Sequence, residues 1–219
     1  MAISASKMTE KQRLTGLIGG TFDPVHFGHL RVAVELAEAF GLPQVALLPC
    51  HQSPHRDRPC ADPCDRKAML ELALEGQQRL TVDDRELQRG GYSYTVETLQ
   101  SLRAELGPQS AIYFAMGFDA FNVLERWKNW QDLFELANIV VVHRPDYVLQ
   151  MNQPQIRERL SQFDGRHYAA GRLYELAVTP LNISASKIRQ LVTQRRSISF
   201  LLPGTVEHYI YQHRLYQHL

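Results

Sequence analysis

Short apolar runs alternate with longer amphipathic stretches along most of the chain, and this alternation constrains the fold more than any other feature of the sequence. The apolar runs have the length and content of buried strands, whereas the stretches between them repeat their apolar residues with helical spacing. Strands that are separated by helices need crossover connections, so the strands run parallel and helices cover both faces of the sheet. We therefore expect an α/β, doubly wound fold with a mainly parallel sheet.

The same patterns give the expected elements and the domain organisation. Polar, aperiodic residues 1–12 predict a flexible N-terminal tail, and residues 13–219 contain no repeat or linker, so we expect them to form a single domain. The C-terminal part predicts a helical extension. The expected strands are residues 14–18, 45–48, 80–82, 111–115, 139–142 and 173–178, and the expected helices are 28–40, 63–75, 95–106, pieces within 118–136, one from near 184, and 205–213.

The charge balance narrows the class of partner. The chain of 219 residues has 24 Lys and Arg against 23 Asp and Glu, a formal charge of +1. A protein dedicated to binding a nucleic acid polymer usually has a basic excess, so we expect no such partner, and any anion must be met by a local cluster. No apolar run is long enough to span a membrane and the first residues lack a secretory signal, so we expect a cytoplasmic protein without a membrane partner.

Three cysteines raise a remote alternative function. Cys50, Cys60 and Cys64 lie with His51 and His55 in a proline-rich segment, which leaves a zinc-binding module open. The spacing contains no Cys-x-x-Cys pair, and an odd number of cysteines without an export signal favours free thiols. We therefore assign no metal ligand in this chain.

The turn after the first expected strand has the features of a phosphate site. It reads GGTFDPVHFGHL, in which Gly19 and Gly20 let the backbone approach a ligand. His26 and His29 are three residues apart at the start of the next helix, so both rings project from one face. A helix start offers unpaired N–H groups and a partial positive charge. Because ligands bind at the carboxyl ends of such strands, this turn predicts a polyphosphate site.

A second motif lies near the C-terminus. The pentapeptide ISASK occurs at residues 3–7 and again at 183–187. Only the second copy precedes an apolar-periodic run, IRQLVTQ, so Ser184 or Ser186 is predicted to cap a helix there. Arg189 lies in the first turns of that helix and adds a cation.

These motifs resemble a known family. GGTFDPVHFGH resembles the signature of the nucleotidyltransferase superfamily with its His-x-Gly-His motif, and in particular that of bacterial nicotinate-mononucleotide adenylyltransferases. ISASKIR, residues 183–189, resembles the second signature of that family, Ile-Ser-Ser-Thr-x-Ile-Arg, from which Ala185 and Ser186 depart. The segments PHR from Pro54, YSYTVETL from Tyr92, GFD from Gly117, Trp127 with Trp130, and HRP from His143 extend the resemblance over residues 14–215.

The resemblance implies a Rossmann-like fold and adenylyl transfer from ATP to nicotinate mononucleotide, which gives nicotinate adenine dinucleotide and pyrophosphate in NAD biosynthesis. Mg²⁺ is the implied cofactor, held mainly by the ATP phosphates. The implied catalytic residues are His26, His29 and Arg189. The implied ATP-binding residues are Gly19, Gly20, Thr21, Phe22, Gly28, Gly117, Asp119, Ile183, Ser184 and Ser186. The implied acceptor-binding residues are Tyr94, Thr95, Trp127, Arg56, His55 and Arg144.

Other acceptors stay open. Relatives with the same turn use nicotinamide mononucleotide, phosphopantetheine or, with CTP as donor, a polyol phosphate. Tyr94, Thr95 and Trp127 favour a pyridine nucleotide among these. A fragment of an aminoacyl-tRNA synthetase is disfavoured because the chain is short and lacks the second, lysine-containing motif. Homo-oligomer formation is left open by the sequence.

Overall fold

A six-stranded parallel sheet forms the centre of the computed structural model, which describes residues 13–55, 58–143 and 154–217. The strand order is β3-β2-β1-β4-β5-β6, and every neighbouring pair is parallel. The direction of winding changes between β1 and β4, which makes their carboxyl ends the switch point of the sheet. The strands are β1 Leu14–Gly20, β2 Val45–Pro49, β3 Leu80–Val82, β4 Ala111–Gly117, β5 Asn138–His143 and β6 Leu173–Ala177.

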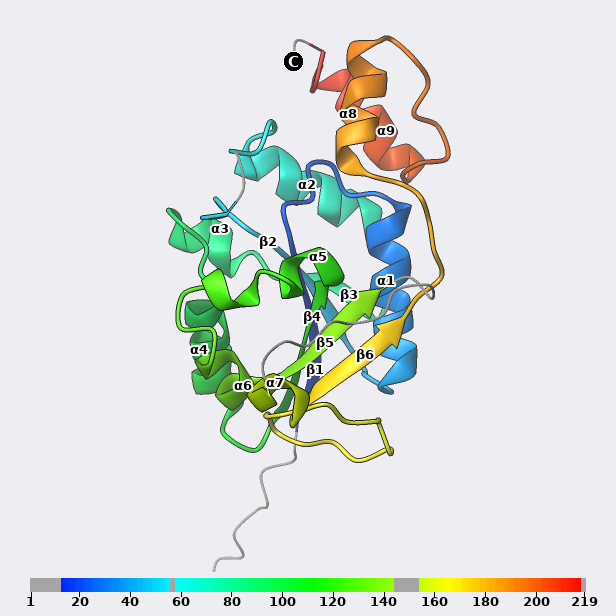
Figure 1. Ribbon diagram of the computed structural model, residues 1–219. Coiled ribbons are helices and arrows are strands. Elements are labelled where there is room, and N and C mark those ends of the chain that lie inside the picture. The colour runs from blue at the N-terminus through cyan, green and yellow to red at the C-terminus, as the bar shows by residue number, and fades with distance from the viewer. Residues whose placement is uncertain (1–12, 56–57, 144–153, 218–219) are drawn as a thin grey trace, which may run out of the picture.

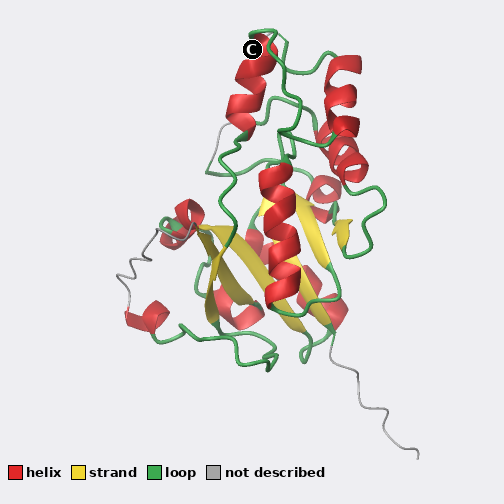
Figure 2. Cartoon of the chain, turned by 90° about the vertical axis from the view of Figure 1, so that its right-hand side faces the viewer, coloured by secondary structure: helices red, strands yellow, loops and turns green. Residues whose placement is uncertain are grey.

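Helices cover both faces of this sheet (Figure 1). Figure 2, turned by 90°, shows the longest helix, α1, lying along one face of the strands. The helices are α1 Phe27–Ala39, α2 Pro63–Ala73, α3 Arg85–Arg89, α4 Thr95–Leu106, α5 Phe118–Phe121, α6 Asp132–Leu136, α7 Pro154–Arg157, α8 Ala185–Thr193 and α9 Gly204–Gln212, with a 3₁₀ turn at Leu124–Arg126. The predicted doubly wound α/β fold is therefore confirmed, together with its helical C-terminal extension.

Two buried layers hold the helices to the sheet, because successive side chains of a strand point to opposite faces. Ile18 of β1 belongs to the layer beneath α1, α2, α8 and α9, and the neighbouring Leu17 belongs to the layer beneath α4 and α6. Burial of each such side chain contributes about 1.5–3 kcal/mol relative to exposure. The strands read as continuous apolar runs because helices cover both faces.

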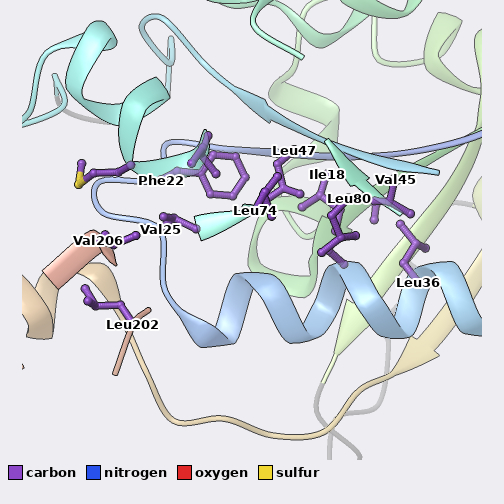
Figure 3. Packing of buried hydrophobic residues seen from close by; sticks show 14 of the residues in the cluster. Ile18, Phe22, Val25, Leu36, Val45, Leu47, Leu74, Leu80, Leu202 and Val206 are labelled. Carbon is purple, nitrogen blue, oxygen red and sulfur yellow. The ribbon is translucent and has the colours of Figure 1, made fainter. Parts of the chain in front are cut away.

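The C-terminal helices share the core of the N-terminal half. Figure 3 shows Leu202 and Val206, which flank the start of α9, near Val25 in the β1–α1 turn. Leu36 of α1 lies farther along the same layer. Packing against the β1–α1 turn therefore fixes where α8 and α9 stand relative to the sheet.

The expected elements agree with the structure to within about two residues at most ends, as is usual for assigned boundaries. The sequence did not predict α3 and α7, which have only 5 and 4 residues and so carry too few turns to show a period. Residues 1–12 lie outside the described residues, and the single domain over 13–219 stays a prediction. In the described part of the chain, no helix has both the length and the apolar character needed to cross a membrane.

Candidate active site

A cavity of about 1110 Å³ opens at the carboxyl ends of β1 and β4, at the switch point of the sheet. Its wall comes from the β1–α1 turn, the segment after β2, the start of α4, the end of β4, the region of Trp127 and the start of α8. The predicted site residues on this wall are Gly19, Gly20, Thr21, Phe22, His29, His55, Tyr94, Thr95, Gly117, Asp119, Trp127, Ser186 and Arg189. The structure thus brings most of the predicted set together from distant parts of the chain.

The β1–α1 turn is built around a buried phenylalanine. Phe22 is 1% exposed and has a φ of +50°, so the chain turns through the left-handed region here. A Cβ on Gly20 would lie 2.9 Å from Cζ of Phe22, closer than real Cβ atoms come to a neighbour. Gly20 is therefore required by the packing of Phe22, in addition to the ligand approach that the sequence predicted for it.

The two histidines form a stacked pair at the start of α1. Their ring centroids are 3.7 Å apart and the planes differ by 22°. The backbone N–H of His26 donates to Nδ1 of His29 over 3.3 Å. Since Nδ1 accepts, the proton of a neutral His29 ring sits on Nε2, an assignment that follows from this hydrogen bond. His29 lines the cavity, and Nε2–H is the donor group of its neutral ring.

His26 occupies a different position from its partner. It is 5% exposed and is not among the residues that line the cavity, although the shared face that the spacing predicted is confirmed. Burial lowers the pKa of His26 to about 4, so the ring is neutral near pH 7. Its Nδ1 is buried and has no hydrogen-bond partner among the described residues. Whether His26 has the catalytic role implied by the resemblance stays a prediction.

Gly28 lies against the buried ring. A Cβ at this position would be 3.0 Å from both Nδ1 and Cε1 of His26. That separation is a few tenths of an ångström shorter than ordinary contact, and the ring is confined on its other side by His29. The glycine of the His-x-Gly-His motif therefore leaves space for the first histidine of the motif itself.

Arg189 reaches the cavity from α8. The side chain of Ser184 accepts the N–H of Lys187 over 3.3 Å, so the predicted cap of this helix is confirmed. Nη1 of Arg189 donates to the backbone carbonyl of Asp23 over 2.7 Å. This contact joins the second motif to the β1–α1 turn. Ile183 and Ser184 themselves are not among the lining residues.

The start of α4 and the residues near Trp127 form another part of the cavity wall. Tyr94 immediately precedes α4 and Thr95 begins it, which confirms their predicted place at a helix start. The rings of His55 and Trp127 are nearly parallel, with centroids 6.1 Å apart. Lys128 adds a cation that the sequence analysis did not select, with Nζ 4.5 Å from the centre of the Tyr94 ring.

A buried acid next to α4 also lines the cavity. Glu86 is 4% exposed, lines the cavity and accepts the hydroxyl of Thr98 over 2.6 Å. Burial raises the pKa of this carboxyl, against the opposing effect of hydrogen bonds from Thr98 and Ser93. Sequence reasoning missed Glu86 because it lies in the short helix α3, where an isolated glutamate reads as a solvated residue.

Arg66 has the largest fully buried side chain among the described residues, and the sequence gave no reason to select it. It is fully buried in α2, and its hydrogen-bond partners among the described residues include no carboxylate. Its guanidinium instead donates to four backbone carbonyls, those of Thr21 at 2.9 Å, Cys50 at 2.6 Å, His51 at 3.2 Å and Ala61 at 3.3 Å. Arg66 thereby ties the β1–α1 turn to the segment that follows β2, which together form one wall of the cavity.

Two predicted residues, Arg56 and Arg144, lie outside the described residues, so their predicted contacts with the acceptor stay predictions. Within the described ranges, no three His, Cys, Asp or Glu side chains are grouped so that they could hold a metal ion. Cys50, Cys60 and Cys64, all within the described residues, form no disulfide. The zinc alternative therefore gains no support from the arrangement of these side chains.

Comparisons with known proteins agree with this geometry. The cytidylyltransferase-like family model matches residues 17–191. The chain is 45% identical over 207 residues to the "Probable nicotinate-nucleotide adenylyltransferase" of Cellvibrio japonicus, covering 92% of this chain and 98% of that one. It is 42% identical over 214 residues to the protein of the same name from Pseudomonas syringae, covering 96% of each.

A solved structure shares the fold. Plasmodium falciparum nicotinic acid mononucleotide adenylyltransferase complexed with NaAD superposes with a TM-score of 0.72 at 17% identity, over 94% of this chain and 98% of that one. At this identity the likeness concerns the fold, whereas the family assignment follows from the matched model and the much closer relatives. The chain belongs to the cytidylyltransferase-like family and, within it, to the nicotinate-nucleotide adenylyltransferases.

Proposed function

We propose that this enzyme transfers the adenylyl group of ATP to nicotinate mononucleotide and so forms nicotinate adenine dinucleotide and pyrophosphate in NAD biosynthesis. The observation that carries the proposal is the cavity at the switch point of the sheet. On its wall, His29 and Arg189 offer donors for phosphate, and Trp127 with the start of α4 offers a flat surface and the N–H groups of a helix start.

The chemistry needs alignment more than proton transfer. A phosphate monoester has its second pKa near 6, so the acceptor is already an anion at pH 7 and no general base is required. One of its oxygens forms a bond to the α-phosphorus of ATP as the bond from that phosphorus to the bridging oxygen breaks. The leaving pyrophosphate keeps the electron pair. The protein must therefore hold two polyanions in line and stabilise the charge that develops.

Arg189 and the Nε2–H of His29 are the donors suited to this task. A hydrogen bond that involves a charged group contributes on the order of 1.5–3 kcal/mol, which corresponds to about one to two powers of ten in rate. In this scheme His26 supports the ring of His29 from behind through the stacked contact of 3.7 Å. Gly19, Gly20 and the other residues of the β1–α1 turn lie along the phosphates.

The remaining assignments divide the cavity between the two substrates. Gly117 and Asp119, at the end of β4, are proposed to meet the ATP ribose, with Ile183 and Ser184 beside adenine and phosphates. Tyr94 and Thr95 stand where the N–H groups of a helix start can receive the nicotinate carboxylate, and Trp127 is proposed to stack on the pyridine ring. The positions of Gly117, Asp119, Tyr94, Thr95 and Trp127 on the wall support that division, and Ile183 and Ser184 directly precede the lining residue Ala185.

Mg²⁺ is proposed as the cofactor. The described residues contain no group of His, Cys, Asp and Glu side chains that could hold a metal ion by themselves. Mg²⁺ keeps several of its waters when it binds, so the ATP phosphates and water can hold it here. When bound there, Mg²⁺ supplies positive charge to the triphosphate. Asp119 is a lining carboxylate in the proposed ATP region that could hold its water shell.

The choice of acceptor is the decisive test. With ATP and MgCl₂, we expect faster pyrophosphate release with nicotinate mononucleotide than with nicotinamide mononucleotide, measured as kcat/KM for each acceptor. An equal or higher kcat/KM for the amide would overturn the acceptor assignment. Absence of pyrophosphate release with either acceptor, or with phosphopantetheine, would overturn the reaction class.

A further inference from the structure

A buried carboxylate stands in the wall of a cavity that we propose binds polyanions. Asp23 is 4% exposed and lines the cavity in the β1–α1 turn. Burying an ionised carboxylate is costly unless donors surround it, and it would also repel a phosphate. Substrate binding therefore does not explain why a carboxylate is buried at this position.

Donors from three distant parts of the chain surround this carboxylate. Oδ2 accepts the backbone N–H of Cys60 over 2.7 Å, and Oδ1 accepts that of Ala61 over 3.1 Å. Oδ1 also accepts the phenol O–H of Tyr216 over 2.8 Å. Nη1 of Arg189 lies 3.7 Å from Oδ2. The carboxylate is therefore the point at which the turn, the segment after β2 and the C-terminal region meet.

Tyr216 provides the contact from farthest along the chain. The residue is 6% exposed and its hydroxyl is separated from Asp23 by 193 positions. Burial, and then the neighbouring carboxylate, raises the pKa of the phenol, so it stays protonated and acts as a donor. Its backbone carbonyl accepts the hydroxyl of Thr193 over 3.1 Å at the end of α8, the helix that carries Arg189.

Arg189 depends on the same aspartate. Its Nη1 donates to the backbone carbonyl of Asp23 and faces the carboxylate of that residue. The hydrogen bonds to the carboxylate thus decide how strongly it attracts the guanidinium in competition with a phosphate. We propose that Tyr216 is a positioning residue: acting through Asp23, it fixes the guanidinium of Arg189 for contact with the phosphates. This inference rests on the proposed function only in taking Arg189 as a phosphate ligand.

The physical reason is competition for one cation. With the phenol in place, the negative charge of Asp23 is shared among three neutral donors, and Arg189 keeps hydrogen-bonding capacity for phosphate. Without the phenol O–H, Oδ1 retains only the N–H of Ala61. The carboxylate then attracts the guanidinium more strongly, so an incoming phosphate must compete with it.

Tyr216→Phe tests the proposal because it removes one oxygen atom and leaves the buried ring. The matched control is Tyr209→Phe. Tyr209 donates from α9 to Oδ1 of Asp65 over 2.9 Å, so this variant loses an equivalent tyrosine–carboxylate hydrogen bond in the same C-terminal region. Asp65 lies on α2 and does not line the cavity. The two variants therefore differ in whether the lost bond leads to Arg189.

We expect Tyr216→Phe to lower kcat/KM for ATP about tenfold, as loss of roughly one charge-assisted contact would do, and to weaken the binding of pyrophosphate by a similar factor. The KM for the acceptor stays within about twofold because its proposed subsite, at Tyr94, Thr95 and Trp127, includes none of the residues that contact Asp23. Tyr209→Phe should leave all three values within about twofold of the wild type. Pyrophosphate binding is measured by titration calorimetry, and thermal unfolding of both variants checks that they fold.

The result that overturns the proposal is an equal effect of the two variants, or wild-type binding of pyrophosphate by Tyr216→Phe. The first would mean that Tyr216 only anchors the C-terminal region, and the second that Arg189 does not depend on it. Failure of the proposed function gives a different result, because the wild-type enzyme would then release no pyrophosphate with any acceptor. The calorimetric comparison with pyrophosphate tests the positioning of Arg189 in that case as well.

Discussion

Replacing Gly28 by alanine tests why the His-x-Gly-His motif contains a glycine. Gly28 is the second residue of α1. In an ordinary helix the change from glycine to alanine stabilises by about 1 kcal/mol, because alanine loses less backbone entropy on folding. If Gly28 were only a helix residue, the variant would be more stable than the wild type.

The structure gives the opposite sign. The new Cβ would lie 3.0 Å from Nδ1 and Cε1 of His26, whose ring is 5% exposed and stacks on His29 at 3.7 Å. Overpacking of this kind typically costs about 1–3 kcal/mol, which exceeds or cancels the helical gain. We expect a net loss of about 1 kcal/mol, or about 2–4 °C in Tm for a chain of this size. The displaced ring presses on His29, so kcat should fall as well.

Gly204→Ala is the matched control. For both variants, thermal unfolding measures stability and pyrophosphate release measures turnover. Gly204 begins α9, and no heavy atom lies within 4 Å of a Cβ built there. This variant should keep wild-type turnover and gain up to about 1 kcal/mol of stability. If Gly28→Ala were stabilised to the same extent and turned over normally, the proposed confinement of His26 would be wrong.

Three further substitutions test separate parts of the site. Burial lowers the pKa of His26 to about 4, against about 6.5 for an unperturbed histidine, so below pH 6.5 the unfolded chain binds a proton that the folded chain does not. The folded protein should therefore lose about 3 kcal/mol of stability as the pH falls from 6.5 towards 4. Urea unfolding of His26→Gln should lack that part of the pH dependence, and an unchanged slope would contradict this. His29→Ala should lower kcat by about one to two powers of ten with an unchanged circular dichroism spectrum, and a variant with wild-type kcat would remove His29 from the proposed role. Arg66→Met leaves four backbone carbonyls without their donor, so we expect a loss of about 3 kcal/mol or more in chemical denaturation, which an unshifted midpoint would refute.

Features that depend on neighbouring residues could be predicted from the sequence. The alternation of strand and helix patterns was sufficient for the doubly wound sheet, since the length and period of each run are local properties. The β1–α1 turn and the cap at Ser184 were predicted for the same reason, because a few consecutive residues carry both signals. The rule that ligands bind at the carboxyl ends of parallel strands predicted the site at the β1–α1 turn, where His29 lines the cavity. The places of Trp127 and Arg189 at the same cavity were expected from the family resemblance.

The tertiary structure alone decided what each of these residues faces. Equal spacing predicted equal roles for His26 and His29, yet only His29 lines the cavity, since the position of the ring depends on what packs behind the turn. Two other contacts join distant segments: Arg66 donates to backbone carbonyls, and Tyr216 donates to Asp23. No repeating sequence pattern indicates such contacts. The sequence by itself determined the sheet and the place of the site, because local patterns encode them, whereas long-range packing determined which side chains reach the site and which hold them there.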